Sequence, residues 1–297
     1  MGESAPAVLP MRRVISKVTT FLEAIKFEHS VFALPFAVLS AFLASDGVPG
    51  ARGLTWIVVA MIGARTFGMS ANRLIDAAID ARNPRTAKRA LPAGLLGKTE
   101  MLAFMVISLG VFGIAVSQLD RLAWFLSPVV PAVMVAYPYL KRFTWLAHVG
   151  LGTIYLIVPP ATAIALTGSL PGWSIWMGCA GLFWVAGFDI IYATADVEVD
   201  RAQRLHSLPA RFGIGAALWI SRTFHLLAVG ALIVAGAWLD AGIVYFLGVA
   251  AVALLLAFEQ SLVSPRDLTR LNAAFFTMNG VIAVVFAVFA CAEAVMA

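Results

Sequence analysis

Residues 101–119 read MLAFMVISLGVFGIAVSQL and contain no charged side chain. An α-helix rises about 1.5 Å per residue, so a run of this length spans the roughly 30 Å hydrocarbon core of a lipid bilayer. Similar apolar runs recur along the chain, without the alternation that is typical of membrane strands. We predict nine spans, at about 22–45, 54–75, 101–119, 122–140, 149–168, 173–193, 217–238, 242–260 and 273–296. The sequence therefore predicts an all-α polytopic membrane protein with nine transmembrane helices, in a single domain that covers residues 1–297.

The composition supports this fold class. Hydrophobic residues make up 61% of the chain and charged residues 12%, whereas about 25% of the residues of a soluble domain are charged. A soluble fold of 297 residues has too small an interior for so many apolar side chains. Lipid solvates the excess, so the composition excludes the ordinary soluble classes.

Basic residues predict the orientation. Most of the 21 Lys and Arg residues fall in the N-terminal segment, residues 1–20, and in the connections after the second, fourth, sixth and eighth spans. The opposite connections contain only Arg52 and Arg121. The positive-inside rule then places the N-terminus and the basic connections in the cytoplasm and the C-terminus on the opposite side of the cell inner membrane. The net charge of +5 is explained by this topology and by contact with anionic lipid, and we predict no nucleic-acid partner.

Two long cytoplasmic connections, 76–100 and 194–216, open with acidic residues at the same spacing. The members of the two series are Asn72, Asp76 and Asp80 and, 120 residues later, Tyr192, Asp196 and Asp200. One series follows the second span and the other follows the sixth, which predicts two four-helix repeats and an added ninth helix. Repeats of this kind in membrane proteins often form a site where the two halves meet.

The acidic series indicate a divalent cation. Carboxylates four residues apart on a helix repel each other, so a repeated series at the membrane boundary needs a reason other than helix stability. Ligand sets made of oxygen alone favour Mg²⁺, which prefers a few carboxylates together with substrate phosphates. The predicted cofactor is therefore Mg²⁺.

Basic side chains accompany the carboxylates, and Arg and Lys bind phosphate oxygens. They are Arg73, Arg82, Arg85, Lys88, Arg89, Lys141, Arg142, Arg201, Arg204 and Arg211. A metal-bridged diphosphate in a membrane protein suggests an isoprenoid diphosphate, with its tail between the helices. The alternative of another class is a transporter of an anionic solute, which predicts ionisable residues near the middle of the membrane, where this sequence has few.

The two motifs resemble those of the UbiA superfamily of intramembrane aromatic prenyltransferases. That family has Asn-x-x-x-Asp-x-x-x-Asp after the second of nine helices, as at Asn72, Asp76 and Asp80, and Asp-x-x-x-Asp after the sixth. Arg73 stands where many members have Asp, which is a departure from the pattern. The run KFEHSVFALP at residues 26–35 is similar to the 4-hydroxybenzoate polyprenyltransferase-like branch, and the resemblance covers essentially the whole chain.

The resemblance implies a Mg²⁺-dependent transfer of a polyprenyl group from polyprenyl diphosphate to an aromatic acid. We expect 4-hydroxybenzoate as the acceptor, in quinone biosynthesis, with a dihydroxynaphthoate of menaquinone synthesis as the alternative. The motifs leave the prenyl length and the oligomeric state open.

The resemblance also implies roles for individual residues. The metal ligands would be Asp76, Asp80, Asp196 and Asp200, and the diphosphate would contact Asn72, Arg73, Arg85, Arg89, Tyr137 and Lys141. Arg65 lies seven residues before Asn72, at the place that faces the aromatic acid in the family. Asp189 has the equivalent place in the other half and would polarise the acceptor or orient a base.

Overall fold

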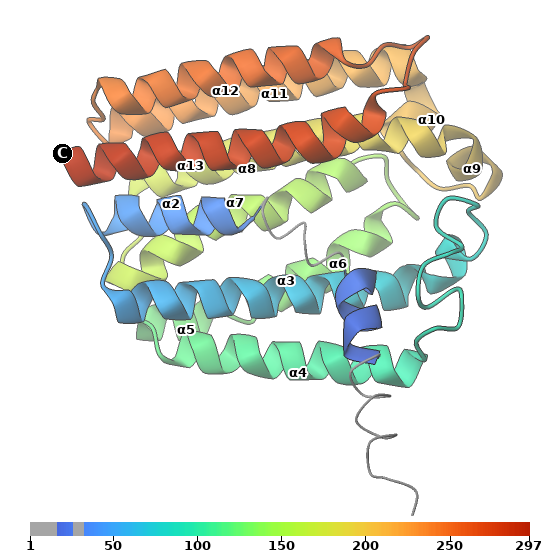
Figure 1. The fold of residues 1–297 in the computed structure, drawn as a ribbon, viewed down its shortest axis with the longest axis horizontal. Coiled ribbons are helices and arrows are strands. Elements are labelled where there is room, and N and C mark those ends of the chain that lie inside the picture. The colour runs from blue at the N-terminus through green and yellow to red at the C-terminus, as the bar shows by residue number, and fades with distance from the viewer. Residues whose placement is uncertain (1–16, 26–32) are drawn as a thin grey trace, which may run out of the picture.

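The computed structural model describes residues 17–25 and 33–297, which form a bundle of roughly parallel and antiparallel helices (Figure 1). Residues 17–24 form a short helix. The helices that follow, apart from two short ones between α8 and α11, are α2 (Leu34–Ala44), α3 (Ala51–Asp80), α4 (Lys98–Ser117), α5 (Arg121–Leu126), α6 (Val129–Leu140), α7 (Ala147–Thr167), α8 (Gly172–Ala193), α11 (Ile214–Trp238), α12 (Ile243–Ser261) and α13 (Asn279–Met296). Between α8 and α11 lie a 3-10 turn, η2 (Thr194–Asp196), and the short helices α9 (Val197–Ala202) and α10 (Leu208–Phe212), and a π-helical turn, η3 (Ala273–Met278), precedes α13.

Within the described residues, eight helical segments are long and apolar enough to cross a membrane, and α2 is a shorter apolar helix. The prediction of an all-α polytopic membrane protein is therefore confirmed. The eight segments correspond to the predicted spans from 54–75 onward. The first predicted span, 22–45, is described only in part, because residues 26–32 lie outside the described residues, as does most of the run at 26–35.

Two predicted features of the spans differ in the structure. The predicted span 122–140 consists of two helices, because Pro128 lies between α5 and α6 and a proline cannot donate the hydrogen bond of a continuous helix. Asn72, Asp76 and Asp80 lie on α3, which continues to Asp80. The first acidic series is therefore part of a helix, and the connection begins after it.

Helix α8 is the most buried of the spanning segments and packs between α7 and α11. The contact between α8 and α7 is close because both helices have glycines where they meet. A Cβ atom at Gly178 would lie 2.3 Å from the carbonyl oxygen of Leu156, and one at Gly152 would lie 2.5 Å from that of Leu182. Small residues allow membrane helices to approach in this way, and here they fix the backbone that carries Asp189.

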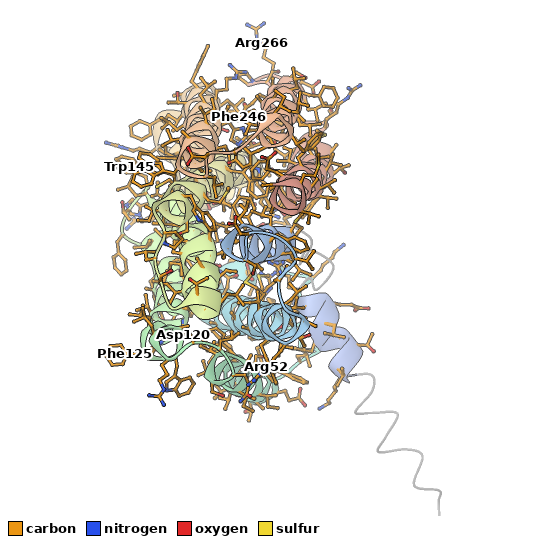
Figure 2. All side chains as sticks on the ribbon, turned by 90° about the vertical axis from the view of Figure 1, so that its left-hand side faces the viewer. Arg52, Asp120, Phe125, Trp145, Phe246 and Arg266 are labelled. Atoms are coloured by element: carbon orange, nitrogen blue, oxygen red, sulfur yellow. The ribbon has the colours of Figure 1, made fainter. Side chains whose placement is uncertain are left out.

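The outer surface of the bundle is apolar. Phe125 is 78% exposed, and Leu226, Ile243 and Leu254 are each 73% exposed. In the end-on view of Figure 2, Phe125 projects outward from the bundle, as does Arg266 from the connection between α12 and α13. Lipid is the solvent that suits the exposed apolar side chains of this surface, whereas Arg266 lies in a connection between two spans.

Both acidic series lie at one end of the bundle, opposite the C-terminus (Figure 1). The backbone N–H of His206, after α9, donates to the carbonyl of Lys141, after α6, at 2.7 Å. Tyr192 at the end of α8 stacks on Phe275 in η3, with 4.0 Å between the ring centroids. These contacts bring together the connections that follow α6 and α8 and the turn that begins the last span.

Candidate functional site

Asp76 is at the centre of the first motif and is 3% exposed. Its Oδ2 accepts hydrogen bonds from Lys141 Nζ at 2.6 Å and from Asn72 Nδ2 at 3.1 Å. Arg142 Nη2 lies 3.6 Å from Oδ1, yet Oδ1 is buried and has no hydrogen-bond partner among the described residues. One oxygen of this carboxylate thus has a free position for a ligand.

Asp80, one helical turn further along α3, is 5% exposed. Arg89 Nη1 donates to both of its carboxylate oxygens at 2.8 Å. Thr86 Oγ1 donates to the backbone carbonyl of Asp80 at 3.0 Å. The connection after α3 therefore turns back over the end of its own helix.

The same connection also holds the second motif. Asp196 Oδ1 accepts from Asn83 Nδ2 at 2.9 Å and from Arg85 Nε at 3.0 Å. Arg85 donates further hydrogen bonds to Asp196 Oδ2 and to the hydroxyl of Tyr192, and its guanidinium carbon lies 4.7 Å from the centroid of the Tyr192 ring. Burial lowers the pKa of Arg85, but its hydrogen bonds to Asp196 and Tyr192 and the charges of these groups outweigh burial and raise it. Residues from the first half of the chain thus hold Asp196, the first carboxylate of the second motif, and Arg85 neutralises its charge.

Asp200 has a neutral partner. Its Oδ2 accepts a hydrogen bond from Ser207 Oγ at 2.7 Å. Ser207 is also the N-cap residue of α10 and accepts from the backbone N–H of Ala210 at 3.4 Å. The fourth predicted metal ligand is therefore held by the segment that follows it.

A cavity of about 840 Å³ runs from this polar end into the bundle. Ten of the twelve predicted site residues line it: Arg65, Asn72, Arg73, Asp76, Arg89, Tyr137, Lys141, Asp189, Asp196 and Asp200. Asp80 and Arg85 lie beside it and are not among the lining residues. The cavity extends to Leu119 and Leu170, in the connections after α4 and α7 at the opposite end of the bundle, and to Leu126 at the end of α5. It is thus charged at one end and apolar along its length.

Two arginines of α3 differ in their surroundings. Arg65 lines the cavity, and its Nε is buried without a hydrogen-bond partner among the described residues. Arg73 is 6% exposed, and its Nε donates to the carbonyl of Ala24 at 3.0 Å. Arg73 therefore ties the helix at 17–24 to α3, which gives a structural reason for an arginine at the position where the family pattern departs.

Asp189 on α8 pairs with a residue that the sequence analysis did not single out. Its Oδ2 lies 2.7 Å from Nδ1 of His148, in the first turn of α7. Sequence reasoning also missed Asn83 and Ser207. A lone histidine in an apolar run was the available signal for His148, and Ser207 directly precedes Leu208 and Pro209, a combination typical of a helix start. The partner of Asn83 is 113 residues away.

The carboxylates suit Mg²⁺ in their chemistry. Their donors are oxygens only, and Asp76 Oδ1 is a buried oxygen in need of a partner. In residues 17–25 and 33–297, however, no group of three His, Cys, Asp or Glu side chains is arranged to hold a metal ion. Three of the four carboxylates are instead paired with Lys or Arg. Metal binding here requires the carboxylates to exchange these cations for the metal.

Most of the chain matches a known protein family. A model of the UbiA prenyltransferase family matches residues 33–281. The chain belongs to this family. The predicted family is thus confirmed, and the chain is a UbiA-family prenyltransferase with a cavity lined by Asp76, Asp196 and Asp200.

Similar members of the UbiA family include proteins named 4-hydroxybenzoate octaprenyltransferase. The one from Shewanella sediminis is 30% identical over 243 residues, which cover 82% of this chain and 84% of that protein. The one from Pseudomonas fluorescens is 30% identical over 236 residues, which cover 79% of each chain.

Solved structures support the fold. A UbiA homolog from Aeropyrum pernix has a TM-score of 0.80 and 31% identity, and the match covers 88% of this chain and 96% of that one. A UbiA homolog from Archaeoglobus fulgidus, solved with GPP and Mg²⁺ bound, has a TM-score of 0.71 at 17% identity over 94% of this chain and all of that one. The second comparison shows the shared fold.

Proposed function

We propose that this protein transfers a polyprenyl group from a polyprenyl diphosphate to 4-hydroxybenzoate, in the presence of Mg²⁺, as a step of quinone biosynthesis. The observation that carries the proposal is the buried Nε of Arg65, which has no hydrogen-bond partner among the described residues and lies in a cavity with acidic and basic side chains at one end. A cation within a membrane span is a functional feature by default, and an aromatic carboxylate is a partner that suits it. The names of relatives with about 30% identity agree with this acceptor.

The charged end of the cavity would bind the diphosphate. Asp76, Asp80, Asp196 and Asp200 would hold Mg²⁺, which neutralises charge on the leaving diphosphate when it is bound. Lys141 and Arg89, now paired with Asp76 and Asp80, would then donate to phosphate oxygens together with Arg85, Asn72 and Tyr137. Arg73 contributes mainly by fixing the helix at 17–24, because its Nε is already bonded to Ala24.

The apolar length of the cavity would bind the prenyl chain. Its lining includes aliphatic residues of α3, α6 and α7 as far as the opposite end of the bundle. Near the charged end, Tyr137, Tyr155 and Phe188 also line it. Aromatic faces stabilise a cation, and an apolar wall keeps water away from it.

The reaction that suits this arrangement is electrophilic aromatic substitution. The bond between the first prenyl carbon and the diphosphate oxygen breaks, and the diphosphate departs with the bonding electrons. The ring carbon ortho to the phenol hydroxyl forms the new carbon–carbon bond and then loses its proton. Arg65 would orient the acceptor carboxylate, and Asp189 would polarise the acceptor or receive the proton.

The charged end of the cavity would lie on the cytoplasmic side of the cell inner membrane, because the connections at that end carry most of the Lys and Arg residues. Cysteine labelling tests this orientation. A membrane-impermeant thiol reagent added to intact cells should label Arg52→Cys and leave Lys88→Cys unlabelled until the cells are lysed. The reverse pattern would contradict the orientation.

A product assay tests the function. Purified protein in lipid nanodiscs would be incubated with Mg²⁺, a polyprenyl diphosphate and either 4-hydroxybenzoate or 1,4-dihydroxy-2-naphthoate, and the products identified by mass. We expect a product that combines the prenyl group with 4-hydroxybenzoate. If only 1,4-dihydroxy-2-naphthoate gave a prenylated product, the acceptor would be the naphthoate and not 4-hydroxybenzoate. Uptake of an anionic solute into vesicles without any prenylated product would favour the transporter.

A further inference from the structure

We propose that His148 is a positioning residue for the transfer reaction: it fixes the carboxylate of Asp189 and couples it to the segment that closes the second acidic motif. This inference rests on the proposed function, since it assigns a role in the step that Asp189 serves.

The geometry determines the form of the histidine. His148 is 4% exposed, and its Nε2 lies 3.3 Å from the backbone nitrogen of Leu208. A backbone N–H can only donate, so Nε2 is the nitrogen without a proton. Nδ1 therefore carries the proton and donates it to Asp189 Oδ2 at 2.7 Å. The hydrogen bond from Leu208 thus selects the tautomer that binds Asp189.

Asp189 is open to the cavity on its other side. Its side chain is 26% exposed, against 5% for that of His148, and both residues line the cavity. His148 holds one carboxylate oxygen, Oδ2, and so sets the direction of the other. The imidazole of His148, which is less exposed than Asp189, would therefore support the carboxylate and would not itself contact the acceptor.

The coupling runs through two consecutive residues. Ser207 Oγ donates to Asp200 Oδ2 at 2.7 Å, and Leu208 donates its backbone N–H to His148. Residues 207–208 are therefore hydrogen-bonded to Asp200, which would hold the metal. Through His148 they are also linked to Asp189, which would contact the acceptor. Correct placement of Ser207 by the second motif carries over to the orientation of Asp189.

A histidine that merely joins α7 to α8 would make the same contacts, so the test needs more than a loss of activity. His148→Leu should lower kcat by about tenfold or more, because small misplacements of a reacting group have effects of this size. The KM for the polyprenyl diphosphate should stay within about twofold of the wild-type value, since the groups that hold the diphosphate are unchanged.

His148→Gln provides the rescue. Its amide combines a donor group, NH2, with an acceptor oxygen, so it can bond both Asp189 and Leu208 as the neutral imidazole does, and it should restore most of kcat. In the background of Asp189→Asn, His148→Leu should cause no further loss, because a residue that acts through Asp189 has nothing left to position. If His148→Leu does not fold, His148→Phe replaces it, because its ring is similar in shape to imidazole and has no nitrogen to bond Asp189 or Leu208.

Several results would overturn the inference while the proposed function stands. The first is a near-normal kcat in His148→Leu, and the second is a kcat in His148→Gln no higher than in His148→Leu. The third is a double variant, His148→Leu with Asp189→Asn, whose loss of kcat equals the product of the two single losses. Absence of prenylated product from the wild-type protein would instead overturn the proposed function, and the inference with it.

Discussion

The two acidic motifs have the same spacing but different backbones. Asp76 and Asp80 lie on the continuous helix α3 and are 3% and 5% exposed. Asp196 and Asp200 lie where α8 has given way to a 3-10 turn and the short helix α9, and both are more accessible. The first motif is therefore placed by its own helix, whereas the second depends on contacts from elsewhere in the chain.

The partners of the two motifs differ in the same sense. The side chains of Lys141 and Asp76 are 28% and 4% exposed, and those of Arg85 and Asp196 are 35% and 16% exposed. Removing one member of a buried pair costs about 3–5 kcal/mol, whereas exposed pairs contribute about 0–1 kcal/mol, so the more buried first pair should contribute more. The charged residues upstream of the motifs differ as well. Arg65 lies seven residues before Asn72, and Asp189 lies seven residues before Asp196. Two similar sequence series thus form a rigid motif, at Asp76 and Asp80, and an adjustable motif, at Asp196 and Asp200, in one site.

The largest expected effect is common to both halves. Asp76→Asn and Asp196→Asn should each lower the rate of prenyl transfer at least about 100-fold, because each removes a charge from the group that stabilises the leaving diphosphate. Both variants should still purify as folded protein. Rates of product formation in nanodiscs measure the effect.

Glu198→Gln is the matched control for these variants. Glu198 lies between Asp196 and Asp200 and is exposed, so its substitution should leave the rate close to that of the wild type. Near-normal transfer by Asp76→Asn or Asp196→Asn would contradict their assignment as metal ligands.

The second effect concerns stability and separates the halves. Lys141→Met leaves the buried charge of Asp76 with a weaker partner, so we expect a loss of about 3 kcal/mol in the free energy of unfolding. Unfolding in mixed micelles at increasing denaturant, followed by tryptophan fluorescence, measures this change. A loss no greater than that of Arg85→Met would remove the distinction between a rigid and an adjustable motif.

The third effect tests the role of Arg65 in binding the acceptor. Arg65→Met should lower kcat/KM for 4-hydroxybenzoate by roughly 30-fold, equivalent to about 2 kcal/mol, because a hydrogen bond to the acceptor carboxylate is lost. The KM for the polyprenyl diphosphate should change little. With the amide of the same acid as acceptor, wild type and variant should react at similar rates, and an equal loss with both acceptors would refute the role.

The smallest expected effect is that of Arg85→Met on stability. Its pair with Asp196 is partly exposed, so the free energy of unfolding should fall by at most about 1 kcal/mol. The same denaturant titration measures it, with and without added salt. A loss above about 2 kcal/mol would show that the second motif is as firmly built as the first.

Much of this arrangement was predictable because lipid makes strict demands on sequence. Long apolar runs determine the spans, and carboxylates at the end of such a run, like Asp76 and Asp196, stand out against them. Pro128 shows the limit of that pattern, since hydropathy does not register a break that arises from a missing backbone donor.

The partners of the carboxylates were harder to predict. Asn83 meets Asp196 across 113 residues, and His148 meets Asp189 across 41. Spacing along one helix gives no information on such contacts, because they depend on how separate helices pack. The pairing of three carboxylates with Lys and Arg also has no signature in the series themselves, because the spacing of acidic residues does not determine which basic side chain each one contacts.

The central claim is that both motifs bind one diphosphate together with Mg²⁺. The most direct measurement is the affinity of the purified protein for a non-reacting polyprenyl thiolodiphosphate, with Mg²⁺ and with chelator, in the wild type and in Asp76→Asn and Asp196→Asn. The account predicts binding that Mg²⁺ strengthens in the wild type and a loss of that strengthening in both variants. Wild-type affinity and Mg²⁺ dependence in either variant would contradict it.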